Sequence, residues 1–333
     1  MAYTPAANLT SSATLPHLQS IYYKKTGLDR LLKKFVFRKP CMKDSIPKAN
    51  GRTVQWFRYR NLSTQPVPTT EGSVGTPQAI SSNVVSATVS QYTSFINVSD
   101  FLMDTGIDST AVNASELLGY QAGLTVDTLT RTIFDNENAS CSLTPLAGAS
   151  GFFRVADLRN CRHQLQALDV QPFEEGEFYV YMHPFVSFDL VNDPAAGGLA
   201  DIFKYNQNVK DTPLVKYEDR GVVTHIAGCR VEETTNVKVT TGSPNKYRVY
   251  AFGKGAVAAL DLEGRGPSNV TDPAKQSFKI NTIKGSPSIV DPEGVIGAAC
   301  SYNFVFTTVV LDGPAGIGGT YRMKQWDAAS SIG

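Results

Sequence analysis

The clearest pattern of apolar and polar positions is a pair of extended runs, residues 52–60 and 83–98. The second run has 16 residues without proline or glycine, and at about 3.3 Å per residue it could reach roughly 50 Å. The runs predict a long β-hairpin arm, joined at its tip by a proline- and glycine-rich loop over residues 62–82. A two-stranded hairpin this polar is marginal in water by itself. We therefore expect the arm to lie against a neighbour, namely another copy of the chain.

Helical spacing appears on both sides of the arm. After it, residues 109–136 repeat apolar side chains on one face and predict a single helix well above the mean length of about 11–12 residues. Before it, residues 15–35 predict an amphipathic helix in which Leu28, Leu31, Leu32 and Phe35 share a face. The chain thus begins with a helix, continues through an extended arm and enters a long helix.

Shorter elements follow the long helix. Residues 155–168 and 185–205 are typical of helices, the second broken near Asp193. Strands are predicted by four apolar runs, of which the last is the strongest: 177–182, 221–226, 247–252 and 302–311. The run 230–235 predicts a further strand, whereas the Gly- and Pro-rich residues 261–297 indicate a loop or insertion. The fold class is α+β, and the sequence shows no internal repeat.

Charge changes this picture at the N-terminal end. Residues 1–60 hold 12 lysines and arginines against 2 acids, whereas the remainder holds 19 against 28. A basic arm on an acidic body suits head-to-tail contacts between copies, or contact with a polyanion such as nucleic acid. A solvated basic helix without a partner is the alternative. The overall composition, 42% apolar and 18% charged, is that of a globular protein without a membrane span.

Candidate chemistry is sparse. Cys161 with His163, or His225 with Cys229, lacks the second pair that a zinc site needs. His183 follows a predicted strand, and we interpret it as structural. Residues 313–319 resemble a phosphate-binding loop but have no amphipathic helix after them, so a turn between strands is favoured. No nucleophile, base and orienting group come together, and five scattered cysteines indicate reduced thiols. We expect no catalytic, cofactor or metal site.

Several short stretches resemble one family of proteins in its own order. They are residues 14–19 (TLPHLQ), 46–59 (IPKANGRTVQWFRY), 70–72 (TEG), 91–92 (QY), 98–102 (VSDFL), 129–131 (LTR), 183–184 (HP) and 228–235 (GCRVEETT). In these stretches the chain resembles the major capsid proteins of tailed bacteriophages, which have the Hong Kong 97-type fold. It is more narrowly similar to the branch typified by coliphage N-four. Residues 236–300 carry no such similarity.

The resemblance implies a domain plan. Residues 1–46 would be the N-terminal arm, 47–100 the extended loop and 101–150 the peripheral domain with its spine helix. Residues 151–300 would be the axial domain, with a possible insertion at 236–300, and 301–333 would return to the peripheral domain.

The resemblance also implies a function. The chain would self-assemble as hexamers and pentamers into an icosahedral phage head, the virion shell, inside the bacterial cytoplasm. Its partners would be a scaffolding protein, a portal, possible decoration proteins and double-stranded DNA bound without sequence specificity. No cofactor and no membrane would be involved.

Particular residues follow from the arm and the charge pattern. Contacts between subunits are expected at Arg52, Trp56, Phe57, Arg58, Tyr59, Arg60 and Glu71. Charge on the inner surface or the N-terminal arm is expected from Lys24, Lys25, Arg30, Lys33 and Lys34.

Two expectations concern covalent processing. Some relatives cross-link subunits through a lysine in the extended loop, but this chain has no lysine between Lys48 and Lys204. We therefore expect shells held only by non-covalent contacts. Some relatives also lose an N-terminal scaffolding segment; because family-like sequence begins at Thr14, we expect an uncleaved subunit and a separate scaffold.

Two other functions remain open. An encapsulin-type compartment would share the fold and enclose a cargo enzyme. A monomeric β-rich enzyme or carbohydrate-binding module would need a compact arm and a convergent polar site.

Overall fold

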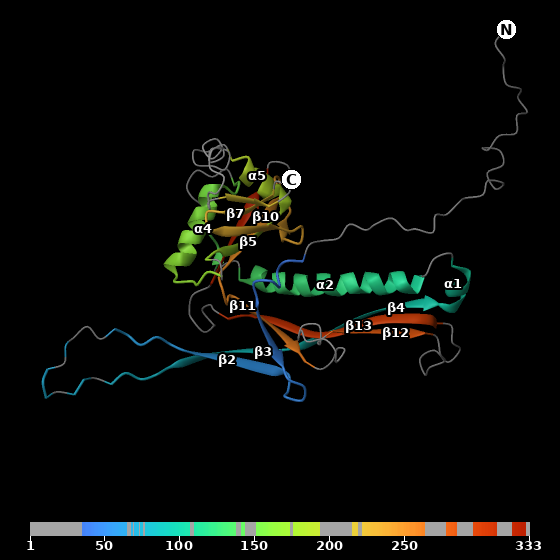
Figure 1. Cartoon of the computed structure of the whole chain (residues 1–333), viewed down its shortest axis with the longest axis horizontal. Helices are drawn as coiled ribbons and strands as arrows, with labels where there is room; N and C mark the ends of the chain where they lie inside the picture. Colours follow the sequence, from blue (N-terminus) through green and yellow to red (C-terminus); the bar gives the residue numbers. More distant parts are fainter. Residues whose placement is uncertain are drawn as a thin grey trace, which may run out of the picture.

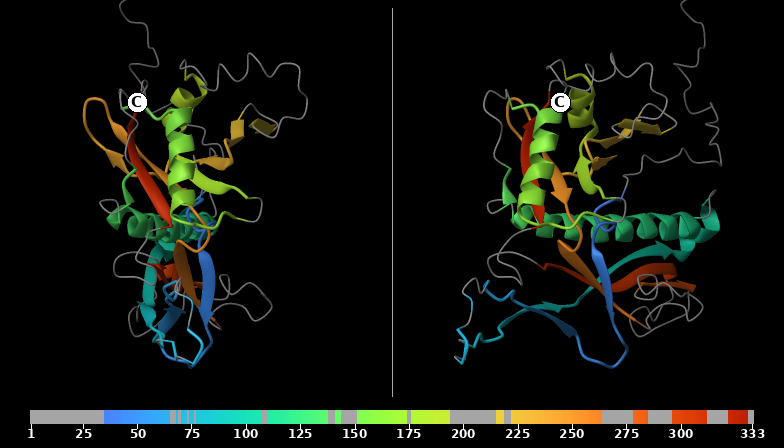
Figure 2. Two further views of the ribbon diagram at one scale, coloured as in Figure 1. Left: turned by 90° about the vertical axis from the view of Figure 1, so that its left-hand side faces the viewer. Right: turned by 60° about the vertical axis from the view of Figure 1, so that its left-hand side comes forward.

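In a computed structural model, the described residues form two large β-sheets, a long helix with shorter helices, and a projecting two-stranded arm (Figure 1). The long helix lies between the sheets in every view (Figures 1 and 2). The described residues are 35–64, 68, 70–72, 74–75, 77–106, 110–137, 141–143, 151–173, 176–193, 215–218, 222–263, 278–284, 296–311 and 322–330. The helix expected at residues 15–35 falls almost entirely outside them.

The first sheet, called the long sheet here, is centred on β13 (Ile296–Val310). It pairs antiparallel with β4 (Ser90–Ser99), β12 (Phe278–Lys284) and β11 (Val257–Leu262), and β11 pairs parallel with β1 (Met42–Ile46). Alternation in β13 places Tyr302, Phe304 and Phe306 in the core. Tyr92 of β4 stacks on Phe304 with ring centroids 5.4 Å apart.

Helix α2 (Thr110–Asn136) covers one face of the long sheet. Its stripe of buried residues includes Leu118, Ala122 and Phe134, as the apolar spacing of the sequence predicts. At its far end, the short helix α1 (Asp100–Thr105) begins where the Ser99 hydroxyl accepts a hydrogen bond from the Leu102 amide.

A buried carboxylate ties α2 to the start of the described chain. Asp127 is 1% exposed and accepts hydrogen bonds from the Val36 amide at 3.0 Å and the Phe37 amide at 2.9 Å. Its other oxygen accepts from the Asn236 side chain at 2.7 Å. Burial raises the pKa of this carboxyl above its ordinary value, and the three donors oppose that rise.

The second sheet has the strand order β14 (Met323–Ala329), β10 (Lys246–Phe252), β5 (Phe178–Met182), β8 (Cys229–Glu233), β7 (Val222–Ile226) and β6 (Val215–Glu218), with β9 (Val239–Thr240) also on β10. Helices α4 (Val155–Ala167) and α5 (Pro184–Val191) lie beside this sheet (Figure 1). An aromatic core joins this sheet to α2. Phe37 packs edge-on against Tyr181 and Tyr250, and the ring centroids of Phe134 and Phe252 are 4.4 Å apart.

The arm consists of β2 (Thr53–Tyr59) and β3 (Ser82–Thr88), paired antiparallel. The prediction of a single return strand over residues 83–98 was wrong. The segment is divided at Val89 into two strands that belong to different sheets: β3 pairs with β2, and β4 pairs with β13. The change of sheet has a physical reason. Ala87 and Val89 are buried in a small cluster with Ile46, Leu260 and Val305, which anchors the base of the arm on the long sheet.

The observed strand pairing also differs from the loop expected at residues 261–297 and from the domain boundary expected at residue 300. Residues 278–284 lie inside the expected loop of 261–297 but form β12, because alternating apolar and polar residues stand between the Gly- and Pro-rich stretches. The boundary expected at residue 300 does not separate the sheets either. β11 and β12 belong to the long sheet, whereas β14 joins the second sheet through β10.

Candidate interaction surfaces

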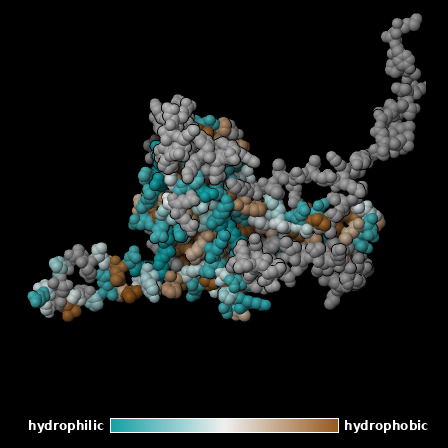
Figure 3. Space-filling model, viewed as in Figure 1, coloured by the Kyte–Doolittle hydropathy of each residue, from teal (hydrophilic) through white to brown (hydrophobic). Residues whose placement is uncertain are grey.

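One face of the arm presents apolar side chains to solvent. Phe57 is 66% exposed and Tyr59 63%, and their rings meet edge to face with centroids 5.9 Å apart. Val84, which is 53% exposed, lies opposite Phe57 in the ladder and therefore on the same face. Figure 3 shows hydrophobic atoms on the projecting arm. Such a cluster has the character of a contact surface, because isolated large apolar side chains are common but grouped ones are not.

The opposite face of the arm is directed at its own chain. Trp56 donates its indole N–H to the Asp44 carboxylate of β1 at 2.8 Å, and with Val54 it packs on the cluster at the base of the arm. The structure thus gives Trp56 an intrachain partner and does not test the contact between chains expected for it. Arg60 likewise donates to the Asn83 side chain at 3.0 Å, while Arg52 is exposed.

The tip of the arm is almost uncharged and carries a few exposed apolar side chains among many serines and threonines. Leu62, Val74 and Ile80 are all exposed, and Glu71 is also exposed. Gly72 has φ +86°, a left-handed conformation that glycine adopts without strain. The carboxylate of Glu71 therefore stands at a turn on the tip.

A second exposed apolar cluster lies at the end of the molecule farthest from the arm (Figure 1). It is made by Phe101, Leu102 and Met103 of α1, with Val112 and Leu117 of α2 nearby in the sequence. Every residue of α1 is exposed. Apolar surfaces at both ends of an elongated subunit suit heterologous contacts, in which one patch meets a different patch on the next copy.

The basic residues expected to contribute inner-surface charge, Lys24 to Lys34, lie outside the described residues. The two cations that follow them are fixed to the body of the chain. Arg38 pairs with Asp261 and lies over the Phe306 ring, 5.3 Å from its centroid. Lys39 pairs with Glu232 at 2.6 Å. These contacts hold the end of the N-terminal segment against both sheets.

The residues considered for catalysis have structural surroundings. His183 accepts a hydrogen bond from the Phe185 amide as the N-cap of α5 and stacks on Tyr247. All five cysteines are buried, and burial raises the pKa of the Cys41 thiol to about 12. Among the described residues, no group of three or more His, Cys, Asp or Glu side chains could hold a metal ion.

Among the described residues, every helix is too short or too polar to cross a lipid bilayer.

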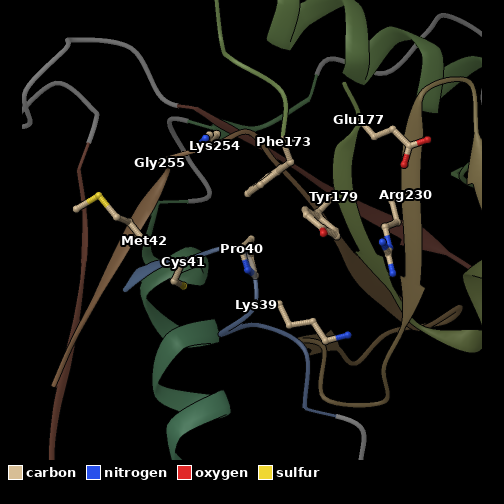
Figure 4. A pocket seen from close by; sticks show the side chains of 10 residues that line it. All are labelled: Lys39, Pro40, Cys41, Met42, Phe173, Glu177, Tyr179, Arg230, Lys254 and Gly255. Atoms are coloured by element: carbon tan, nitrogen blue, oxygen red, sulfur yellow. The ribbon is translucent and has the colours of Figure 1, made fainter. Parts of the chain in front are cut away.

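A cavity that the sequence pattern did not indicate opens between the start of β1 and the second sheet (Figure 4). It holds about 300 Å³ and is lined by Lys39, Met42, Phe173, Glu177, Tyr179, Arg230 and Lys254, among others. These residues come from four separate segments, so only folding brings them together. Three cations with two aromatic rings make it an anion-binding candidate.

Several solved structures with this arrangement are phage capsids. No family model and no curated relative matches the sequence. The capsid structure of cyanophage P-SCSP1u is similar with a TM-score of 0.65 at 14% identity, over 99% of this chain and 100% of that one. The capsid of Ralstonia phage GP4 gives 0.62 at 12%, over 99% of both chains. This chain has the Hong Kong 97-type capsid fold.

The capsid fold is not confined to phage structures. The encapsulin of the holo-SrpI complex from Synechococcus elongatus is also similar, with a TM-score of 0.56 at 10% identity over 97% of this chain and 96% of that one. The fold expected from the short sequence stretches is confirmed. The narrower similarity to the coliphage N-four branch stays a prediction.

Proposed function

We propose that this chain is the major capsid protein of a tailed phage. Its subunits assemble as hexamers and pentamers into an icosahedral head that encloses double-stranded DNA. The observation that carries the proposal is the arm: a two-stranded projection on a capsid fold, with an exposed apolar face formed by Phe57, Tyr59 and Val84. That surface supports a structural role in assembly.

The two sheets have separate roles in the proposed shell. The long sheet with α1 and α2 is the peripheral domain, with α2 as its spine helix, and the second sheet is the axial domain that meets its copies at the capsomer centre. Residues 1–46 are the N-terminal arm and 47–100 the extended loop. Because β11 and β12 pair with β13, the peripheral domain also takes strands from within residues 236–300.

The arm is the proposed clasp between neighbours. Phe57 and Tyr59 bury their rings against the next copy, and Trp56 keeps the base of the arm on its own body through Asp44. Arg52, Arg58 and Arg60 pair with acids of that copy. The contact is obligate, so each subunit should bury more than about 2,000 Å² in total.

The remaining partners follow from the same role. A scaffolding protein guides assembly in the bacterial cytoplasm, a portal occupies one vertex, and decoration proteins can cover the finished virion. Lys24, Lys25, Arg30, Lys33 and Lys34 supply positive charge that neutralises DNA phosphates without reading the sequence. This charge balances the acidic remainder of the chain.

An encapsulin-type compartment is the second candidate, favoured by the similarity to the SrpI encapsulin. The two functions differ in what the shell contains. An encapsulin holds a cargo protein, whereas a phage head holds DNA.

Sedimentation and content analysis test the proposed function. The protein is expressed alone and with its scaffold, and the particles are separated from subunits on a gradient. We expect the protein expressed with its scaffold to form closed shells. Shells isolated from infected cells should contain double-stranded DNA that is protected from nuclease. Shells with a single cargo protein and no DNA would support the encapsulin instead. A species with the mass of one chain under all conditions would contradict both.

A further inference from the structure

The arm carries a single charge beyond its base. Between Arg60 and Asp100 the only charged residue is Glu71, at the exposed turn of the tip. The loop from Tyr59 to Ser82 leaves the hairpin and returns to it. Half of its length, fully extended at about 3.3 Å per residue, reaches roughly 35 Å. The arm therefore offers one isolated carboxylate far from its own body.

The cavity beside β1 has the complementary charge. Lys39, Arg230 and Lys254 line it, and Figure 4 shows the three cationic side chains around the Phe173 and Tyr179 rings. Arg230 lies over the Tyr179 ring, 5.6 Å from the centroid, which holds the guanidinium in place. The two aromatic rings form part of the cavity wall.

The described acids at the cavity, Glu177 and Glu232, are fewer than its three cations. Glu232 forms ion pairs with two cations, Lys39 at 2.6 Å and Arg230 at 3.7 Å. Glu177, the acid in the lining, is held by His225 at 2.7 Å. Lys254 is exposed and has no ion-pair partner among the residues that the structure describes. Among the described residues, Lys254 is therefore the lining cation without an ion pair.

We propose that Glu71 of one subunit docks in this cavity on a second copy of the chain and pairs with Lys254. The proposal rests on the proposed shell function and identifies where the tip of the clasp ends. The cavity and the tip come from one chain, so each subunit gives one Glu71 and receives another, as a closed ring requires. Because Lys254 is exposed, the pair is expected to contribute modestly, as surface ion pairs do.

Charge exchange tests the pairing. Glu71→Lys and Lys254→Glu are each expected to raise the concentration needed for assembly about fivefold. The double variant is expected to return to within about twofold of the native protein. Lys238→Glu, an exposed lysine outside the cavity, is the matched control and should assemble normally. Failure of the double variant to recover would overturn the pairing.

Cysteine trapping tests the proximity itself. Subunits carrying Glu71→Cys are co-assembled with subunits carrying Lys254→Cys and oxidised, which joins the two thiols as a disulfide with loss of two electrons to the added oxidant. Because the five native cysteines are buried, a dimer on a non-reducing gel reports this pair. We expect that dimer, and none when Thr93→Cys replaces Glu71→Cys.

The outcomes separate this inference from the proposed function. Shells that form without a trapped dimer would overturn the docking site and leave the capsid role standing. A native protein that never forms shells would overturn the capsid role. If Lys254→Glu leaves assembly unchanged and lowers the DNA content of the shells, the cavity serves nucleic acid and the docking proposal is wrong.

Discussion

Trp56 and Phe57 are adjacent in β2 but point to opposite faces of the arm, so they separate folding from assembly. Trp56→Phe removes the hydrogen bond to Asp44 and is expected to lower the free energy of unfolding by about 1 kcal/mol. Phe57→Ser, on the exposed face, should change it by less than about 0.5 kcal/mol.

Urea unfolding of unassembled subunits measures the first effect, and particle yield on a gradient measures the second. Phe57→Ser should lose most of its particles, whereas Trp56→Phe should assemble wherever it is folded. An unchanged particle yield for Phe57→Ser would contradict the role of the exposed face.

His183 predicts a dependence of stability on pH. Burial lowers the pKa of this side chain below its ordinary value of 6.5. The unfolded chain therefore binds the proton first, and the stability contributed by neutral His183 is lost as the pH falls below 6.5 toward the folded pKa. His183→Asn keeps an N-cap acceptor for the Phe185 amide and cannot titrate there.

The unfolding free energy of both proteins should be measured between pH 7.5 and 5.0. The native protein is expected to lose more stability over this range than His183→Asn. Parallel curves would show that His183 does not contribute the titration.

The sequence predicted a structural role for His183 at the end of a strand. It grouped Trp56 with Phe57 and Tyr59 as contact residues, because adjacent apolar residues do not show which face of a strand is exposed. The bond from Trp56 to Asp44 and the cavity of Lys39, Arg230 and Lys254 were not predictable. Their partners lie far apart in the sequence or in another strand, and no local pattern records that contact.

At the scale of elements, the arm is expected to serve assembly and not folding of the subunit. Replacing residues 61–80 with Asn-Gly closes a two-residue hairpin turn directly on the retained pairing of β2 and β3. The anchoring cluster around Val89 and Ile46 remains intact. We expect a folded subunit with an unchanged circular dichroism spectrum and no shells. Normal shells from this variant would refute the clasp.

Elements with a strong period were found by sequence reasoning, and elements defined by distant pairing were not. The apolar stripe through Leu118 and Phe134 predicted α2 almost to its ends. The sequence gives no signal for the change of sheet at Val89, because residues 83–98 contain neither proline nor glycine. β12 was missed because Gly- and Pro-rich neighbours concealed its short alternation, and its place beside β13 depends on non-local pairing.

For the whole molecule, the lysine distribution predicts how the shell is held. A cross-link from the arm needs a lysine nucleophile, and the chain has none between Lys48 and Lys204. Mature particles boiled in detergent should therefore give a single band at the mass of one chain. A ladder of covalent oligomers would contradict a shell held by strand pairing, apolar contact and charge.

In a closed shell, the arm of each subunit is expected to clasp the next copy. Electron cryomicroscopy of particles assembled with the scaffold would show where each arm lies. We expect an icosahedral shell in which β2 and β3 extend over a neighbour, with Phe57 and Tyr59 buried there. A shell whose arms fold onto their own subunits, or leave those two rings in solvent, would contradict it.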